Sequence, residues 1–130
     1  DTIEVKKLFN SDIKDFITKA EIIQNAKVIN NNICLAYTKT ETDNINIVIA
    51  QAADELLNIK EVEASFVLAR KDDRVFISAR SLGNINVHVL MENLGGGGHR
   101  DMAGAQLDTS LEKAYEMVKD TIQTCIKEEE

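Results

Sequence analysis

Two apolar runs joined by a short polar turn constrain the fold of this chain more than any other feature. Residues 62–69 alternate with a period of two, yet both alternating sets are mainly apolar or small, which is the pattern of a strand covered on both faces. Residues 71–74 are polar and predict a turn, and residues 75–80 then pair back as the next strand. We therefore expect a β-hairpin in the middle of a sheet.

The remaining segments predict helices and further strands around this hairpin. Asn10-Ser11-Asp12 is a candidate helix cap, and the apolar residues that follow at helical spacing predict a helix from about Ser11 to Asn25. The other expected elements are two strands around an Asn-rich turn in residues 28–37, a helix over residues 45–56, a helix with the buried stripe Val87, Leu90, Met91 and Leu94, a strand over residues 103–107 and a last helix capped by Ser110. The predicted fold class is α/β, a single domain with a mixed β-sheet of about five strands and helices packed on it.

The composition fits one globular domain and argues against a general polyanion binder. At 130 residues and 44% hydrophobic content, the chain is long enough to build a real core. The net charge is −7, whereas proteins that bind nucleic-acid duplexes usually carry a basic face. No segment has the length and hydrophobicity of a membrane span, and no signal peptide opens the sequence. Because the sequence begins at Asp1 rather than methionine, we expect it to be part of a longer protein.

Four of the six glycines stand in a row at Gly95–Gly98, followed by His99 and Arg100. Glycine lets the backbone adopt φ > 0 and approach a ligand closely, and a row of bare N–H groups can form an anion-binding nest. The favoured interpretation is a small pocket for a phosphate or a nucleotide, and the alternative is a flexible linker. Apolar sequence on both sides favours the pocket. The spacing matches neither the dinucleotide-binding fingerprint nor a P-loop, and Gly95 is also well placed to end the preceding helix.

Charged side chains on either side of the glycine run supply the candidate ligand contacts. His99 can donate to a phosphate oxygen or to a base edge, and Arg80 and Arg100 can add bidentate phosphate contacts. The alternative for Arg80, at the end of the second hairpin strand, is a surface arginine or a local ion pair. His88 falls inside a predicted helix and is better explained as a packed or half-exposed side chain than as a ligand. Asp101 is better explained as the partner of an arginine than as a general base.

The sequence contains no recognisable constellation for catalysis. Metal-assisted hydrolysis needs Asp and His residues gathered around one or two ions, and neither such a cluster nor a Ser/His/Asp or Cys/His motif is present. Cys34 and Cys125 are far apart and match no metal spacing, so we interpret them as thiols in a reducing compartment, with a disulfide as the alternative. The residues alone therefore predict a binding domain without the machinery to break a bond.

One stretch of the chain resembles a known family. From Phe76 to Leu107 the sequence reads FISARSLGNINVHVLMENLGGGGHRDMAGAQL. The Ser-Ala-Arg-Ser stretch, the Ile-Asn-Val helix start and the GGGGH loop followed by small residues resemble the DHH-associated domain, the C-terminal half of DHH-family phosphoesterases. Within that family they are most similar to the membrane-anchored cyclic di-AMP phosphodiesterases of the Firmicutes. The resemblance implies that residues 1–130 are one DHH-associated, substrate-binding domain.

The resemblance also implies a division of labour between two domains. A preceding DHH domain, absent from this sequence, would hold two manganese ions through Asp and His ligands, and a metal-activated water would attack the phosphodiester. This chain would itself hold no catalytic residue, metal or other cofactor, and would be inactive in isolation. The substrate-binding roles carry over to Gly95, Gly96, Gly97, Gly98, His99 and Arg80, with Ser81, Asn86 and Arg100 as further candidates.

The implied activity is hydrolysis of cyclic di-AMP to linear pApA in the intact protein. One alternative is a DHH phosphoesterase that degrades short oligoribonucleotides. Another is a non-catalytic module for self-association or nucleic-acid contact, since related domains end alanyl-tRNA synthetases, although the acidity of this chain argues against tRNA. The implied partners are a cyclic dinucleotide or short oligonucleotide, the preceding DHH domain of the same polypeptide, and a second copy in a homodimer. The domain is expected in the cytoplasm without membrane contact, in a parent protein anchored in the membrane.

Overall fold

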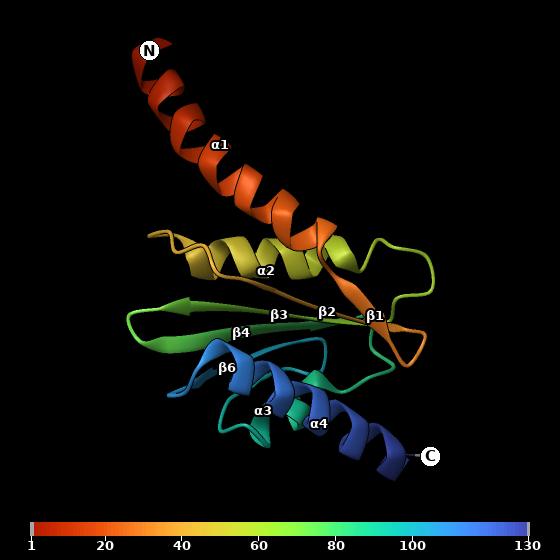
Figure 1. Ribbon diagram of the computed structural model, residues 1–130. Helices are drawn as coiled ribbons and strands as arrows, with labels where there is room; N and C mark the ends of the chain where they lie inside the picture. Colours follow the sequence, from red (N-terminus) through yellow and green to blue (C-terminus); the bar gives the residue numbers. More distant parts are fainter. Residues whose placement is uncertain (1, 130) are drawn as a thin grey trace.

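The computed structural model describes residues 2–129, with side chains from residue 13 to residue 126. The described residues form four helices and six strands, and Figure 1 shows how the helices pack around the sheet. The helices are α1 (Thr2–Gln24), α2 (Ile45–Leu56), α3 (Val87–Glu92) and α4 (Leu111–Glu129), and the strands are β1 (Lys27–Ile29), β2 (Ile33–Thr38), β3 (Ala64–Lys71), β4 (Arg74–Ser81), β5 (Gly97–Gly98) and β6 (Met102–Leu107). The predicted α/β class is confirmed.

All six strands form one mixed sheet in the order β1-β2-β3-β4-β6-β5. The β2–β3 pair is parallel, and the other four neighbouring pairs are antiparallel. Parallel neighbours cannot be joined by a tight turn and need a crossover connection, which α2 provides between β2 and β3. The predicted hairpin is confirmed as β3 and β4, which are paired over their full length in the centre of the sheet.

Helices cover both faces of the sheet, and the sheet divides the hydrophobic core into two clusters. One core cluster lies under α3 and α4 and includes the β4 residues Val75, Ile77 and Ala79. The other lies under α2 and the C-terminal part of α1. Figure 1 shows α1 leaning away from the sheet toward its N-terminal end. Because β4 alternates between the two clusters, its residues Phe76, Ser78 and Arg80 point to the α2 face.

Two expectations from the sequence need correction. The sheet has six strands rather than five, because part of the glycine run pairs with β6 as the short strand β5. The first helix starts at Thr2 rather than near Ser11, because a Ser or Asp that can cap a helix does not stop one when helix-forming residues precede it. The apolar stripe of α1 is also largely exposed, with Ile13, Phe16 and Ile17 at 51%, 63% and 52%.

The remaining predicted elements are confirmed, with two structural details. The Asn-rich turn joins β1 to β2 with positive φ at Asn30 and Asn31, the conformation that Asn tolerates better than most residues. Ser110 caps α4 by accepting a hydrogen bond from the Lys113 amide at 3.1 Å. Within residues 2–129, every helix is too short or too polar to traverse a bilayer.

The two cysteines lie on opposite faces of the sheet. Cys34 is buried in the cluster under α2, and burial raises the pKa of its thiol. Cys125 packs on α4 against the other cluster. The disulfide alternative is therefore wrong, because the sheet stands between the two sulfur atoms.

Candidate functional site

The first two residues of the glycine run end α3 in a specific backbone motif. Gly95 has φ +84° and its amide donates to the Glu92 carbonyl at 3.0 Å, while the Gly96 amide donates to the Met91 carbonyl at 2.8 Å. This pair of bonds defines a Schellman motif, in which the residue with positive φ is usually glycine. The predicted role of Gly95 as the helix-ending glycine is confirmed.

Gly96 and Gly98 let the run approach β6 more closely than any side chain would permit. A Cβ atom on Gly96 would lie 2.1 Å from the Gly104 carbonyl oxygen, and one on Gly98 would lie 2.5 Å from the Ala103 Cα. Both are backbone atoms of β6, so they cannot move without separating the strands. Gly97 differs, because a Cβ there would meet only the His88 ring, at 4.0 Å. Backbone conformation or close packing therefore requires glycine at three of these four positions, Gly95, Gly96 and Gly98.

The run ends in a tight hairpin turn that places His99 opposite β6. The His99 amide donates to the Met102 carbonyl at 2.7 Å, and the Met102 amide donates back at 3.3 Å. Met102 is in turn the register partner of Arg80 on β4. Adjacent strands lie about 4.8 Å apart, so the backbones of Arg80 and His99 are separated by about 10 Å with Met102 between them. The structure therefore brings these two predicted site residues to the same end of the sheet.

Arg80 is held in place by partners that leave part of its guanidinium open. Its Nε donates to the Asp54 carboxylate at 3.0 Å, and one Nη donates to the Ala79 carbonyl at 2.9 Å. Its side chain is 12% exposed, whereas that of Asp54 is 60% exposed. An arginine carries five N–H donors, so three remain for an anionic ligand. The alternative of a local ion pair is thus confirmed for Arg80, and that ion pair also fixes its position.

Ser81, Asn86 and Arg100 have structural partners in the described part of the chain. The buried Ser81 hydroxyl accepts from the Gly83 amide at 2.9 Å. The Asn86 side chain caps α3 by accepting from the backbone amides of residues 88 and 89. The Arg100 Nε donates to the Gly83 carbonyl at 2.7 Å. These three residues fix the turns around β4, α3 and the glycine run, and only Arg100 keeps an exposed charged group.

A groove runs along the α2 face of the sheet beside the glycine run. It has a volume of about 510 Å³ and is bounded by Asn46 and Ile49 of α2, Phe76 and Ser78 of β4, Gly104 and Gln106 of β6, and Gly95 and Gly96. Gly104 leaves the middle of the floor without a side chain. Arg80 lies on the same face of β4, two residues beyond Ser78. The sequence contains no signal for Asp54 or Phe76, since both look like ordinary scaffold residues.

His88 and the acidic residues do not extend this site. His88 is half-exposed on α3 and its Nε2 pairs with the Glu92 carboxylate, which confirms its interpretation as a packed, half-exposed side chain. Among the residues whose side chains the structure describes, no three His, Cys, Asp or Glu gather in a way that could hold a metal ion. The candidate site therefore consists of backbone amides, one anchored arginine and one exposed histidine.

Comparison with known proteins identifies relatives over nearly the whole chain. A family profile for the DHHA1 domain matches residues 30–128. "Cyclic-di-AMP phosphodiesterase GdpP" of Bacillus subtilis is 42% identical over 126 residues, which cover 94% of this chain and 19% of that protein. "Cyclic-di-AMP phosphodiesterase PdeA" of Listeria monocytogenes is 38% identical over 116 residues, which cover 88% of this chain and 18% of that protein. The chain therefore spans about a fifth of the length of these relatives.

The fold also matches solved structures. The crystal structure of an exopolyphosphatase-related protein from Bacteroides fragilis superimposes with a TM-score of 0.74 at 21% identity, over 85% of this chain and 34% of that one. At this level of identity the likeness concerns the fold alone. The resemblance that the residues from Phe76 to Leu107 carry is confirmed by the family match and by the sequence relatives.

Proposed function

This chain belongs to the DHHA1 domain family, and on that premise we propose that it is the nucleotide-substrate-binding half of a cyclic di-AMP phosphodiesterase. The observation that carries the proposal is the 42% identity to a cyclic di-AMP phosphodiesterase over 94% of the chain. In the reaction, water adds to one phosphorus atom and the P–O3′ bond breaks. The released 3′ oxygen takes a proton, so that the cyclic molecule opens to linear pApA.

The reaction requires a metal site, which the described part of this chain does not provide. The described side chains contain no cluster able to hold a metal ion, so manganese does not fit here. We assign the metal to a preceding DHH domain of the same polypeptide, which fits the fact that the relatives are about five times longer than this chain. On this proposal the isolated chain binds substrate and does not hydrolyse it.

The substrate-binding role falls on the end of the sheet where Arg80 and His99 come together. The Asp54 carboxylate and the Ala79 carbonyl hold the Arg80 guanidinium in one orientation, which lowers the entropy lost when its remaining N–H groups bind a phosphate. The exposed His99 imidazole can donate to a phosphate oxygen from the neighbouring hairpin. Beside it, the exposed backbone of Gly98 is open to a ligand that contacts His99.

The cellular setting follows from the same proposal. We assign the domain to the cytoplasmic side of a membrane-anchored parent protein, as in the phosphodiesterases that it resembles. A homodimer is the expected assembly of that parent. Both statements concern the longer polypeptide and are tested on it by fractionation and by light scattering.

A second candidate function is degradation of short oligoribonucleotides by the same two-domain arrangement. A surface that binds phosphates and one base could accept either cyclic di-AMP or a short oligoribonucleotide. The net charge of −7 favours the smaller one, because each further phosphate must approach an acidic protein. A non-catalytic module for self-association or nucleic-acid contact is the third candidate, and it would leave the open N–H groups of Arg80 without a use.

The test is a comparison of substrates with the polypeptide that carries both domains, in the presence of manganese. We expect faster turnover of cyclic di-AMP than of a short RNA. Replacing Arg80 with Lys keeps the charge but removes the planar fork of donors, and replacing His99 with Ala removes a donor without touching the core. Both variants should lose turnover while Arg70→Lys, on β3 beside the turn to β4 and away from this site, keeps it. Intact cyclic di-AMP after incubation with the unaltered protein would refute the proposal.

A further inference from the structure

The groove beside the glycine run has the shape and chemistry of a base-binding site. Its two walls are α2 and the start of the glycine run, and its floor is formed by β4 and β6. We propose that this groove binds the purine base of the substrate and that it prefers adenine. The inference rests on the proposed function for the identity of the substrate, but it concerns residues for which the family motif gives no role.

An aromatic ring and an aliphatic side chain supply the apolar surfaces. Phe76 is half-buried on the α2 face of β4, and Ile49 faces it from α2. Aromatic rings bind nucleobases by stacking on their π faces. Gln106 is the register partner of Phe76 on β6, and the next residues along the floor on the same face are the small Ser78 and Gly104, which are register partners of each other. A flat base therefore has both a stacking partner and room beside it.

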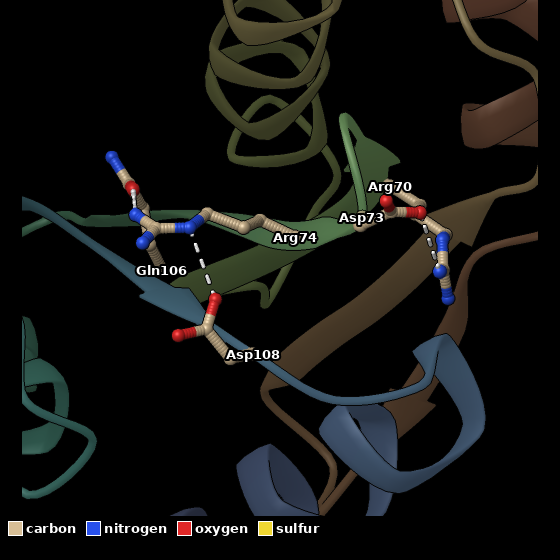
Figure 2. A network of polar contacts seen from close by, with 5 residues as sticks. All are labelled: Arg70, Asp73, Arg74, Gln106 and Asp108. Atoms are coloured by element: carbon tan, nitrogen blue, oxygen red, sulfur yellow. Dashed lines mark hydrogen bonds and ion pairs between the residues drawn. The ribbon is translucent and has the colours of Figure 1, made fainter.

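One amide at the edge of the groove is oriented by a chain of polar contacts. The Gln106 Oε1 accepts from an Nη of Arg74 at 3.0 Å, and the Arg74 Nε contacts the Asp108 carboxylate at 3.0 Å. Figure 2 shows that the Gln106 amide nitrogen consequently points away from the guanidinium. Because its oxygen is engaged, Gln106 offers the ligand a donor. Purine ring nitrogens are acceptors, so this group favours a purine edge.

A second amide can distinguish adenine from guanine. Asn46 lies in the first turn of α2, is exposed and lines the groove. An asparagine amide pairs bidentately with adenine, since its oxygen accepts from N6 and its nitrogen donates to N7. Guanine presents two acceptors, O6 and N7, at the same edge. Asn46 therefore makes two hydrogen bonds with adenine and loses one of them with guanine.

The distance from this groove to the phosphate-binding end suits one nucleotide. Phe76 and Arg80 are four residues apart on the same face of β4, which corresponds to about 13 Å of strand. The Arg80 side chain extends toward Asp54 of α2, the helix whose first turns wall the groove. A nucleotide whose base stacks on Phe76 can thus direct its phosphate to Arg80. The groove and the arginine are two parts of one binding surface.

The experiment is an amide NMR titration of the 130-residue chain with AMP, GMP and inorganic phosphate as separate probes. We expect AMP to shift the amides of Gly96 and Gly104 at lower concentration than GMP, and phosphate to leave both in place. The variant Phe76→Leu keeps an apolar side chain without a π face and should weaken AMP binding by about 5- to 100-fold. Asn46→Ala should reduce the preference for AMP over GMP by at least about fivefold.

The variants separate this inference from the proposed function. Asn58→Ala removes another exposed amide, two residues beyond the C-terminal end of α2 and outside the groove, and should change nothing. If AMP and phosphate shift only the amides of Arg80 and His99, the base site is refuted while the phosphate site stands. An absence of shifts in Gly96 and Gly104, or an equal response to AMP and GMP, also refutes it. If AMP binds the groove but the longer polypeptide leaves cyclic di-AMP intact, the proposed function fails and the base site remains.

Discussion

The four consecutive glycines should differ sharply in their tolerance of an added methyl group. In Gly96→Ala the new Cβ would lie 2.1 Å from the Gly104 carbonyl oxygen and 2.7 Å from the Ala105 Cα. Both atoms belong to the β6 backbone, so relief requires β5 to move away from the sheet. Overpacking of this kind costs about 1–3 kcal/mol. With a urea dependence of about 2 kcal/mol per molar, a cost of about 2 kcal/mol lowers the unfolding midpoint by about 1 M.

Gly97→Ala is the matched control, because it adds the same methyl group one residue away. Its Cβ would make only an ordinary contact with the His88 ring, at 4.0 Å, and the backbone there is not in the left-handed region. A glycine-to-alanine change at a compatible position stabilises a protein by about 0.4–1 kcal/mol, since the unfolded chain loses freedom. We therefore expect its urea midpoint to equal or exceed that of the unaltered protein.

The assay is urea unfolding followed by far-UV circular dichroism for the two variants and the unaltered chain. The expected order of midpoints is Gly97→Ala at or above the unaltered protein and Gly96→Ala clearly below it. Equal losses in both variants would show that the run needs glycine for flexibility rather than for its close approach to β6. A neutral Gly96→Ala would show that β5 does not pack on β6 as described.

Three further predictions concern single side chains. Asp54→Ala frees the Arg80 guanidinium, so turnover of cyclic di-AMP by the longer polypeptide should fall about fivefold or less, the loss expected for an ion pair with an exposed carboxylate. Arg80→Ala should cost more; equal losses would mean that Asp54 does more than orient the arginine. His99→Ala removes an exposed side chain and should abolish most turnover, while the free energy of unfolding from the urea transition should change by less than about 0.5 kcal/mol. An unfolded variant would show that the histidine has a structural role. Hydrogen bonds from two asparagine amides hold the pKa of Glu63 below its usual range, so its stabilising effect is present at neutral pH and disappears as the pH falls through that lowered pKa. The urea midpoint of Glu63→Gln should accordingly be lower at pH 7 and converge with that of the unaltered protein in acid; a constant gap would contradict this.

The sequence predicts most of the fold because its central elements are locally unambiguous. Residues 62–69 and 75–80 alternate with a strand period around a turn in which Asp72 and Asp73 both adopt positive φ, the backbone of a type I′ hairpin. Ser110 and Asn86 mark helix starts by a mechanism that depends only on neighbouring amides. Local signals of this kind are independent of tertiary context.

The sequence-based predictions are wrong where an element depends on tertiary pairing or where the local sequence signal is weak. No residue pattern marks Gly97–Gly98 as a strand, because its pairing depends on the β6 backbone, with Gly97 opposite Gly104 and Gly98 opposite Ala103, and not on β-forming side chains. The cap-like residues near Ser11 mark neither the start nor the end of a helix, because α1 continues on both sides of them. A cap motif predicts a helix start only where the preceding residues are unsuited to helix.

The candidate site was predictable in its residue types but not in its partners. The glycine run, Arg80 and His99 stand out in the sequence, and β4, β6 and the hairpin turn bring them to one end of the sheet. Asp54 comes from α2, and its pairing with Arg80 depends on how that helix crosses the sheet. Phe76 resembles any strand phenylalanine until the groove beside it is seen.

The most direct test of the central claim is an amide NMR titration of this chain with cyclic di-AMP and with linear pApA. If the chain is the substrate-binding half of the enzyme, the largest shifts should lie in Gly95–Gly98, His99 and Arg80. They should be weaker in Arg80→Lys and absent in a double variant with His99→Ala. Shifts spread over the exposed face of α1, or none in the glycine run and Arg80, would contradict the claim that this surface binds the substrate.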